Sequence, residues 1–342
     1  MKLKLLTILA ALFCVAASCT ASFDGADSPV DYVSTLVGSM SKHSISTGNT
    51  YPAIARPWGM NFWTPMTGTM GDGWTYTYTA DQIRGFKQTH QPSPWINDYG
   101  QFVIMPVTTG AHFDQQERAS WFSHKAETAK PYYYSVYLAD HDVFAELTPT
   151  DRAAAFRLTY PERDMSYLVV DAFDKGSFVR VIPEKNMIVG YTTKNSGGVP
   201  DNFRNWFVVV CDTPFDYVRT VSDGRNMSES LSSESFHSGA LVGFKTARGQ
   251  KVGLRVASSF ISLEQAERNL AELGDGDFDR LVAEGKSRWN EVLGRISVED
   301  ENVDNLRTFY SCLYRSVLFP RSFYEKTAAG EIVHYSPYNG KV

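Results

Sequence analysis

The stretch Tyr132–Tyr160 reads YYYSVYLADHDVFAELTPTDRAAAFRLTY. It contains three short runs rich in aromatic and apolar residues, separated by turn-forming Asp, Pro and Thr. Runs of this kind, about eight in all, recur from residue 30 to residue 245, and no helix-length pattern lies between them. The chain is therefore predicted to be mainly β, with an antiparallel β-sandwich rather than a parallel α/β sheet. The predicted strands are Gln101–Val107, Tyr132–Leu138, Val143–Leu147, Ala153–Tyr160, Tyr167–Ala172, Asn186–Thr193, Trp206–Cys211 and Ala240–Thr246, with a last strand at Val252–Phe260.

Helical signals begin only after this last strand. Ser262 opens a Ser-x-x-Gln capping box, and the helix that follows should reach about Leu273. Asp277 is the expected N-cap of a second helix, whose apolar residues keep helical spacing. A third helix is predicted over Val303–Phe319, and Pro320 should end it because proline donates no backbone N–H. The chain is thus predicted to change from strands to helices near residue 260.

The first residues have the pattern of a targeting segment. Lys2 and Lys4 precede the apolar run Leu5–Ala17, which is shorter than the roughly 20 residues that a membrane-spanning helix needs. Small residues then lead to Cys19, a pattern that resembles the lipobox of bacterial lipoproteins. We therefore expect a signal peptide over 1–18, lipidation of Cys19 and a polar tether over 19–29. The alternative is a plain secretory signal in which the cysteine is incidental.

The composition excludes one class of partner. The net charge of the 342-residue chain is −5 and no run of Lys and Arg occurs, so no nucleic-acid partner is expected. Apolar residues make up 43% and charged residues 21%, as in ordinary soluble globular proteins. Aromatic residues, at 13%, are the one excess, and they favour β-structure and carbohydrate-binding surfaces.

Two cysteines lie beyond the N-terminal segment, Cys211 in a predicted strand and Cys312 in the predicted third helix. Neither has a CxxC partner or the spacing of a metal site. A disulfide framework is not expected, even in an exported protein, and both side chains are predicted to be buried small hydrophobic groups.

Aromatic rings concentrate in the segment Gly48–Pro106. It carries four Trp, several Tyr and one His, broken by Gly and Pro, which is the composition of a loop. Exposed aromatic faces are poorly solvated, so these rings must pack against the protein or cover a ligand. A sugar is such a ligand, because its C–H faces stack on rings while its hydroxyls need Asp, Asn, Arg and His. Each Trp taken singly is expected in the core, whereas the cluster as a whole predicts a binding site.

An ordered set of short segments can be compared with known families. The segments are Asp31–Gly38, Gly48–Pro52, Pro57–Met60, Arg84-Gly85-Phe86 with Thr89-His90, Asp98-Tyr99-Gly100 with Met105-Pro106, Trp289-Asn290, and Pro320-Arg321. In this order they resemble glycoside hydrolase family 92, the calcium-dependent exo-acting α-mannosidases of bacteria. The resemblance covers nearly the whole chain after the N-terminal segment.

The resemblance implies a two-part architecture, an N-terminal β-sandwich packed on a C-terminal (α/α)6 barrel with the active site between them. On this basis residues 30–260 are expected to form the sandwich, residues 261–298 a helical linker and residues 299–342 the start of the barrel. It also implies hydrolysis of α-mannosides with inversion, in which one carboxylic acid protonates the leaving oxygen and another carboxylate activates water. The acid, the base and most ligands of a Ca²⁺ ion are expected beyond Val342, so no catalytic or metal-binding residue is assigned within the chain.

Five residues are predicted to contact sugar from the sandwich side. Trp95 could stack on a sugar ring or lie in the core, and His90 could bind a hydroxyl or orient its loop. Asp98 could accept from hydroxyls or cap backbone amides, and the cap is the stronger interpretation for Asp-Tyr-Gly. Arg84 could reach a barrel carboxylate or be a surface charge. Asn49 could contact a ligand or simply adopt the left-handed conformation of a turn.

The chain departs from the family pattern between His90 and Asp98. A small, Gly-rich segment is usual there, whereas this chain has Gln91–Asn97, and Gln101 stands where an acidic residue is usual. The expected partners are mannose-containing glycans and, through Cys19, a membrane of the bacterial cell envelope. The alternative function is a carbohydrate-binding surface lipoprotein without hydrolysis.

Overall fold

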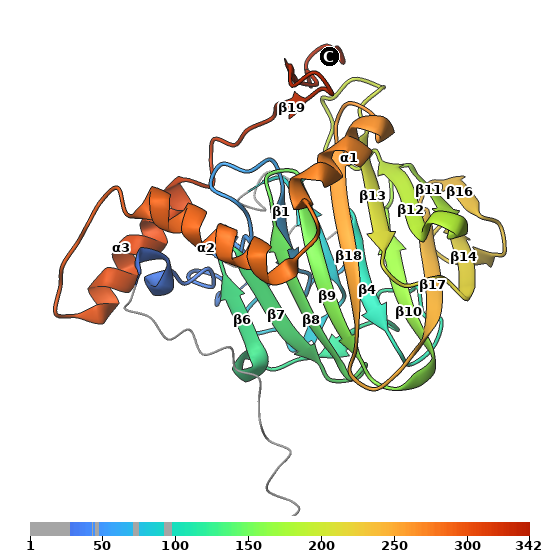
Figure 1. The fold of residues 1–342 in the computed structure, drawn as a ribbon, viewed down its shortest axis with the longest axis horizontal. Helices are drawn as coiled ribbons and strands as arrows, with labels where there is room; N and C mark the ends of the chain where they lie inside the picture. Colours follow the sequence, from blue (N-terminus) through green and yellow to red (C-terminus); the bar gives the residue numbers. More distant parts are fainter. Residues whose placement is uncertain (1–27, 43, 45–47, 71–74, 92–97) are drawn as a thin grey trace, which may run out of the picture.

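The structure is a computed structural model that describes residues 28–42, 44, 48–70, 75–91 and 98–342. Within these ranges the chain forms two stacked antiparallel sheets, and three α-helices follow along one side of them (Figure 1). The predicted fold class, mainly β with a sandwich followed by helices, is confirmed. The proposed lipidation site Cys19 and the predicted signal peptide lie outside the described residues.

The two large sheets contain seven and nine strands. The seven-stranded sheet runs, in spatial order, β1 (Phe62–Pro65), β3 (Phe86–Thr89), β4 (Val103–Val107), β10 (Arg163–Asp171), β17 (Gly239–Thr246), β14 (Tyr217–Ser222) and β15 (Asn226–Ser228). The nine-stranded sheet runs β16 (Ser232–Ser235), β11 (Ser177–Ile182), β12 (Met187–Thr192), β13 (Asn205–Cys211), β18 (Gln250–Ser259), β9 (Ala153–Tyr160), β8 (Val143–Pro149), β7 (Tyr133–Leu138) and β6 (Glu127–Lys130). Short pairs β2 (Gln82–Ile83) with β5 (Ser120–Trp121) and β19 (Glu325–Lys326) with β20 (Ile332–Val333) complete the strands, and short 3-10 turns lie at Pro29–Tyr32, His124–Ala126, Pro183–Lys185 and Leu270–Leu273.

The main core lies between the two sheets. Because side chains alternate along a strand, Val179 and Val181 of β11 are buried while Phe178 is half-exposed on the opposite face. Trp63 is fully buried, and Phe156 meets its ring edge-on with centroids 5.2 Å apart. This dry aromatic and aliphatic layer holds the sheets together.

The helices begin where the capping residues predict. The Ser262 hydroxyl accepts from the Gln265 amide at the start of α1 (Leu263–Asn269), and the Asp277 carboxylate accepts from the Arg280 amide at the start of α2 (Phe278–Leu293). The third helix, α3 (Val303–Ser316), ends three residues before the predicted end. The residue before a proline is disfavoured in the α conformation, so the chain leaves the helix ahead of Pro320.

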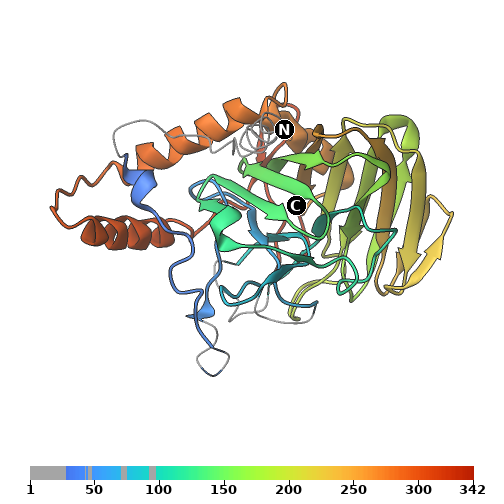
Figure 2. The same cartoon turned by 90° about the horizontal axis from the view of Figure 1, so that it is seen from below.

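The helices pack on the sandwich through two separate clusters. α1 and the 3-10 turn after it cover Val189, Val208 and Ala257 on the outer face of the nine-stranded sheet. α2 and α3 lie on either side of the 3-10 turn Pro29–Tyr32 instead (Figure 2). Trp289 and Tyr314 are among the buried side chains there, and they donate hydrogen bonds to Ala55 and Ala53, more than 200 positions earlier in the chain. These two helices are therefore packed against the segment that leads into the sandwich.

Two local expectations are corrected, and one short element was not predicted. The segment Gly48–Pro106 is not a loop throughout, because it contains β1, β3 and most of β4, and Trp63 belongs to the core. Cys211 is buried as expected, but Cys312 is exposed because its side of α3 faces away from the Trp289–Tyr314 cluster. The last residues contain the short β19–β20 hairpin.

Candidate functional site

The Asp98 carboxylate joins the two ends of the loop between β3 and the Asp-Tyr-Gly turn. Its Oδ1 accepts hydrogen bonds of 2.9 Å from the backbone amides of both His90 and Tyr99. This is the capping role that Asp-Tyr-Gly predicts. Trp95 stands between His90 and Asp98 in the sequence and lies outside the described residues.

His90 is fully buried at the end of β3. Its Nδ1 lies 2.7 Å from the Tyr99 carbonyl oxygen, its Nε2 lies 3.2 Å from the Asn61 amide oxygen, and its ring stacks on Tyr99 with centroids 5.3 Å apart. Burial, together with the nearby Arg321 charge, lowers the pKa of His90 well below its ordinary value. The imidazole is therefore neutral, and it holds Tyr99 in position through the hydrogen bond and the ring contact.

Arg321, which follows α3, reaches the same place from the helical side. Its Nη2 donates to the Tyr99 hydroxyl, and its guanidinium lies over the rings of Tyr99 and Phe323, 5.4 and 4.4 Å from their centroids. The sandwich and the chain segment after the helices thus meet at Tyr99. Tyr99 and Arg321 were not among the predicted sugar contacts, although both stand in segments that carry the family resemblance, Asp98-Tyr99-Gly100 and Pro320-Arg321.

Two further residues brace this region. The Asn205 side chain on β13 fixes the turn that carries Tyr99, because it donates to the Gly100 carbonyl oxygen at 2.5 Å and to the Gln88 side chain at 3.0 Å. The Tyr51 hydroxyl holds the end of β3, because it bonds to Thr89 at 2.8 Å and also donates to the Gln91 carbonyl oxygen. Sequence reasoning missed both supports because their hydrogen bonds join residues that are distant in the chain.

Burial raises the free energy of the charged groups at this junction. It raises the pKa of Asp98 to about 7 and lowers the pKa of Arg321 to about 10. Within the described part of the chain, Asp98 Oδ2 and Arg321 Nε and Nη1 are buried without a hydrogen-bond partner. Such atoms carry a desolvation penalty that a bound hydroxyl or water would relieve. We refer to Asp98, His90, Tyr99 and Arg321 together as the junction cluster.

The other two predicted contacts lie differently. Asn49 adopts the left-handed conformation with φ 51°, as a turn residue would, and its Oδ1 is buried without a partner in the described ranges. Arg84 lies before β3, at the end of the strand opposite to His90, and donates to the Thr67 carbonyl oxygen at 2.5 Å and to Gln116 at 3.0 Å. The structure therefore brings His90 and Asp98 together but places Arg84 at the other end of the strand.

Calcium prefers six to eight oxygen ligands, with carboxylates prominent among them. Residues 28–342, apart from the undescribed gaps, contain no group of three or more His, Cys, Asp or Glu side chains that could hold a metal ion. At the junction cluster one carboxylate, Asp98, lies near the cationic Arg321, and a cation nearby disfavours Ca²⁺. The described residues by themselves do not fit a calcium site.

Family comparison agrees with this arrangement of sandwich and helices. Residues 32–259 match the glycosyl hydrolase family 92 N-terminal domain, and residues 265–342 match the family 92 catalytic domain. The chain belongs to glycosyl hydrolase family 92. The match to the N-terminal domain ends with β18, and the match to the catalytic domain begins within α1, so the two matches divide where the chain changes from strands to helices.

Solved structures of family 92 are similar over most of the chain. An inverting mannosidase of family 92 from Bacteroides thetaiotaomicron is 45% identical with a TM-score of 0.88, and the match covers 92% of this chain and 43% of that one. A family 92 alpha-mannosidase from the same species is 26% identical with a TM-score of 0.77, covering 91% and 44%, and it has also been solved with mannoimidazole.

A curated relative, an uncharacterized secreted glycosidase of Arthroderma benhamiae, is 23% identical over 331 residues, 85% of this chain and 42% of that protein. The chain therefore spans less than half the length of each of these relatives.

Proposed function

We propose that the whole protein is an exo-acting α-mannosidase that releases terminal mannose from glycans with inversion at the anomeric carbon. The observation that supports this most is the match of 92% of the chain, at 45% identity, to an inverting mannosidase of the same family. An inverting mechanism needs a carboxylic acid and a second carboxylate roughly 6.5–9.5 Å apart, with water between them. We assign neither role to a residue of this chain.

In this proposal the sandwich forms one wall of the sugar site. The junction cluster places a carboxylate and a guanidinium, both with unpaired polar atoms, between the two parts of the chain. Arg321 can donate to sugar hydroxyls, and the Asp98 carboxyl can accept from them. His90 and Asn205 act through Tyr99 and Gly100, whose positions they fix. We expect Trp95 and Asn49 to contribute to the same wall.

The test is hydrolysis by the full-length protein. Incubation with an aryl α-mannoside should release mannose, and proton NMR during the first minutes should show the β-anomer as the initial product. Release of the α-anomer first would contradict inversion, and the absence of any release from aryl or oligomannose α-mannosides would contradict the function.

Arg321→Lys tests the wall separately. Lysine keeps the charge but loses the planar group that lies on Tyr99, so kcat/KM should fall by about tenfold or more. The matched control is Arg288→Lys in α2, an exposed arginine that pairs with Glu291, and this variant should keep wild-type kcat/KM. Equal activity of both variants would remove Arg321 from the proposed site.

Calcium dependence is proposed for the whole enzyme on the family resemblance. Exhaustive EDTA treatment should abolish mannose release, and added CaCl₂ should restore it. Full activity after chelation would contradict a calcium requirement.

We further propose that the protein is exported and anchored in the bacterial cell envelope by a lipid at Cys19, with residues 1–18 removed. The described residues contain no helix long and apolar enough to cross a membrane. Cells fed radiolabelled palmitate should label the wild-type protein, and Cys19→Ser should lose the label. Labelling of the Ser variant would contradict this site. The division into sandwich, linker and barrel at residues 30–260, 261–298 and 299–342 remains part of the same proposal.

A further inference from the structure

Four neighbouring strands of the nine-stranded sheet carry one continuous row of side chains. Glu234 on β16 is the register partner of Phe178 on β11, Phe178 that of Tyr191 on β12, and Tyr191 that of Trp206 on β13. Register partners point to the same face of a sheet. Since Val179, the next residue of β11, is buried in the core, this row points outward.

The three rings form a contiguous aromatic surface. Phe178 and Tyr191 stack with centroids 5.6 Å apart and planes 28° apart, and Trp206 meets Tyr191 edge-on at 4.9 Å. All three side chains are half-buried. Trp206 also packs against the cluster beneath α1, whereas Phe178 and Tyr191 continue past it toward the β16 edge. Packing against α1 therefore accounts for the position of Trp206 but not for Phe178 and Tyr191.

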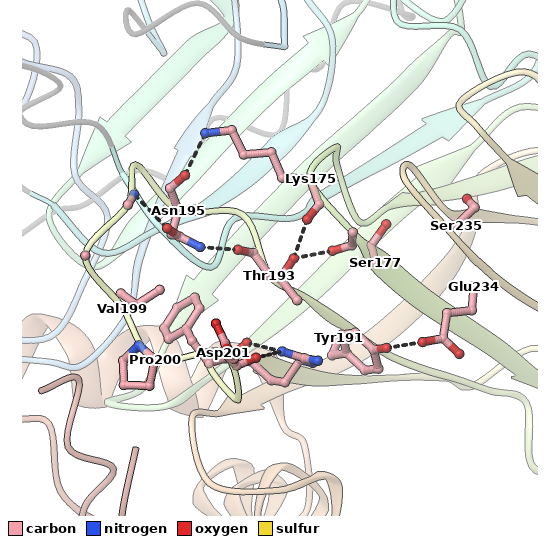
Figure 3. Close-up of a pocket in the computed structure, with 15 residues that line it drawn as sticks. Lys175, Ser177, Tyr191, Thr193, Asn195, Val199, Pro200, Asp201, Glu234 and Ser235 are labelled. Atoms are coloured by element: carbon pink, nitrogen blue, oxygen red, sulfur yellow. Dashed lines mark hydrogen bonds between the residues drawn. The ribbon is translucent and has the colours of Figure 1, made fainter. Parts of the chain in front are cut away.

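A hollow of about 480 Å³ is lined by Tyr191 and Glu234, two members of this row (Figure 3). The loop after β12 forms one wall, where Thr193 donates to the Lys175 and Gly176 carbonyl oxygens and the Lys175 ammonium donates to Asn195. Gly197 has φ 107° in that wall, and a Cβ added there would meet nothing within 4 Å. The Gly197 backbone is thus not packed against other described residues on its Cβ side.

Positively and negatively charged side chains surround the rings. The Tyr191 hydroxyl donates to Glu234 Oε1 at 2.5 Å, and the Arg204 guanidinium lies 4.9 Å from the Tyr191 ring centroid. Lys175 and Asp201 also line the hollow. Two carboxylates and two cationic groups give the hollow no net preference for a strongly anionic or a strongly cationic ligand. A neutral ligand with many hydroxyls and an apolar face can stack on the rings and hydrogen-bond to these side chains.

We propose that the aromatic row Phe178–Tyr191–Trp206 and the adjoining hollow form a surface site that holds a carbohydrate chain without cleaving it. Pyranose rings stack on Tyr191 and Phe178, and their hydroxyls bond to Glu234 and Arg204. Phe203 lines the hollow and also contacts Tyr99, with ring centroids 6.1 Å apart, so this site adjoins the junction cluster. A glycan held here remains close to the junction. The proposal rests on this geometry and stands whether or not the protein hydrolyses mannosides.

Affinity electrophoresis of the full-length protein in gels that contain yeast α-mannan, a β-glucan or a galactan tests the site. At least one polysaccharide should retard the wild type, and Tyr191→Ala should weaken that binding by about tenfold or more. Tyr191→Phe keeps the ring and loses only the bond to Glu234. Its affinity for the polysaccharide should lie between those of the wild type and of Tyr191→Ala. Thermal unfolding of each variant checks that the fold is kept.

The matched control is Trp121→Ala. Trp121 is an aromatic side chain with 51% of its surface exposed, and it lies on β5 in the short β2–β5 pair rather than on the sheet that carries the row. Its loss should leave retardation unchanged. Hydrolysis of a small aryl α-mannoside, which reports on the junction alone, should be unchanged in Tyr191→Ala. The proposal is overturned if none of the polysaccharides retards the wild type, or if Tyr191→Ala is retarded as strongly as the wild type.

Discussion

The indole Nε1 of Trp289 in α2 donates a hydrogen bond of 2.8 Å to the carbonyl oxygen of Ala55, and both groups are buried. This bond joins a helix that follows the sandwich to a segment that precedes most of its strands. It thereby fixes the position of α2, and with it the direction in which the chain continues toward Arg321.

Trp289→Phe should destabilise the fold by about 1–3 kcal/mol, because the Ala55 carbonyl oxygen would stay buried without its donor. The smaller ring would also leave space beside Tyr314. The midpoint of urea unfolding measures the loss. Arg288→Gln, on the exposed face of the same helix, should shift the midpoint hardly at all. Equal midpoints for wild type and Trp289→Phe would contradict the role of this bond.

Asp98→Asn should change how stability depends on pH. Burial raises the pKa of Asp98 from its ordinary 3.8 to about 7, so between these values the folded chain holds a proton that the unfolded chain has lost. The stability of the wild type is therefore reduced by this group as pH rises from about 4 to about 7. The variant lacks the effect, and its stability relative to wild type should rise by about 1.4 kcal/mol per pH unit in that window. Urea unfolding at several pH values measures this, and a pH-independent difference would contradict it.

Asp171→Asn should destabilise the sandwich by about 3–5 kcal/mol, because it leaves a buried guanidinium without its counter-ion. Asp171 lies 2.9 Å from Arg118 and 2.7 Å from His237. Burial alone would raise the pKa of Asp171, but Arg118 and His237 hold it well below its usual range. Its stabilisation is hence complete above about pH 4 and lost as pH falls through the lowered pKa.

Thermal unfolding at neutral pH measures the effect of Asp171→Asn. Asp164→Asn removes an exposed carboxylate 3.6 Å from Lys245 and serves as the control, with no measurable change expected. Similar unfolding temperatures for the two variants would show that the buried group of Asp171, Arg118 and His237 contributes little to the stability of the fold.

Gly100→Ala should lower both stability and mannoside hydrolysis. Gly100 has φ 62°, and an added Cβ would lie 2.8 Å from the Asn205 Cβ, closer than real Cβ atoms approach. We expect a loss above about 1 kcal/mol and a lower kcat/KM in the full-length enzyme, because the displaced turn carries Tyr99. Gly330→Ala has the same backbone strain at φ 82° but no neighbour within 4 Å, so it should be milder and leave kcat/KM intact. Equal effects of the two substitutions would contradict the packing argument.

Local signals in the sequence were enough for most of the secondary structure. Alternation of apolar residues located β9 at Ala153–Tyr160 to the residue, and the caps Ser262 and Asp277 located the starts of two helices. Strands with weak local signals, such as β1, β3 and β16, were missed, because their pairing comes from neighbours distant in the chain.

The candidate site was predicted only in part. His90 and Asp98 stand in motifs that local sequence can reveal, and the structure brings them together. Arg84 was expected beside them because it precedes the same motif, but a strand's length separates it from His90. Arg321 and Asn205 could not be assigned from local sequence, since they reach Tyr99 and Gly100 across more than a hundred residues.

The sequence by itself determined the family, the sandwich and the capped helices, because periodicity, capping residues and short motifs are properties of neighbouring positions. Only the tertiary structure decided which of the predicted site residues lie in contact with one another. The neutral His90, the raised pKa of Asp98 and the aromatic row beside Tyr191 all arise from burial and strand register. Burial and register join positions that the linear order keeps far apart, so they exist only once the sheets have stacked.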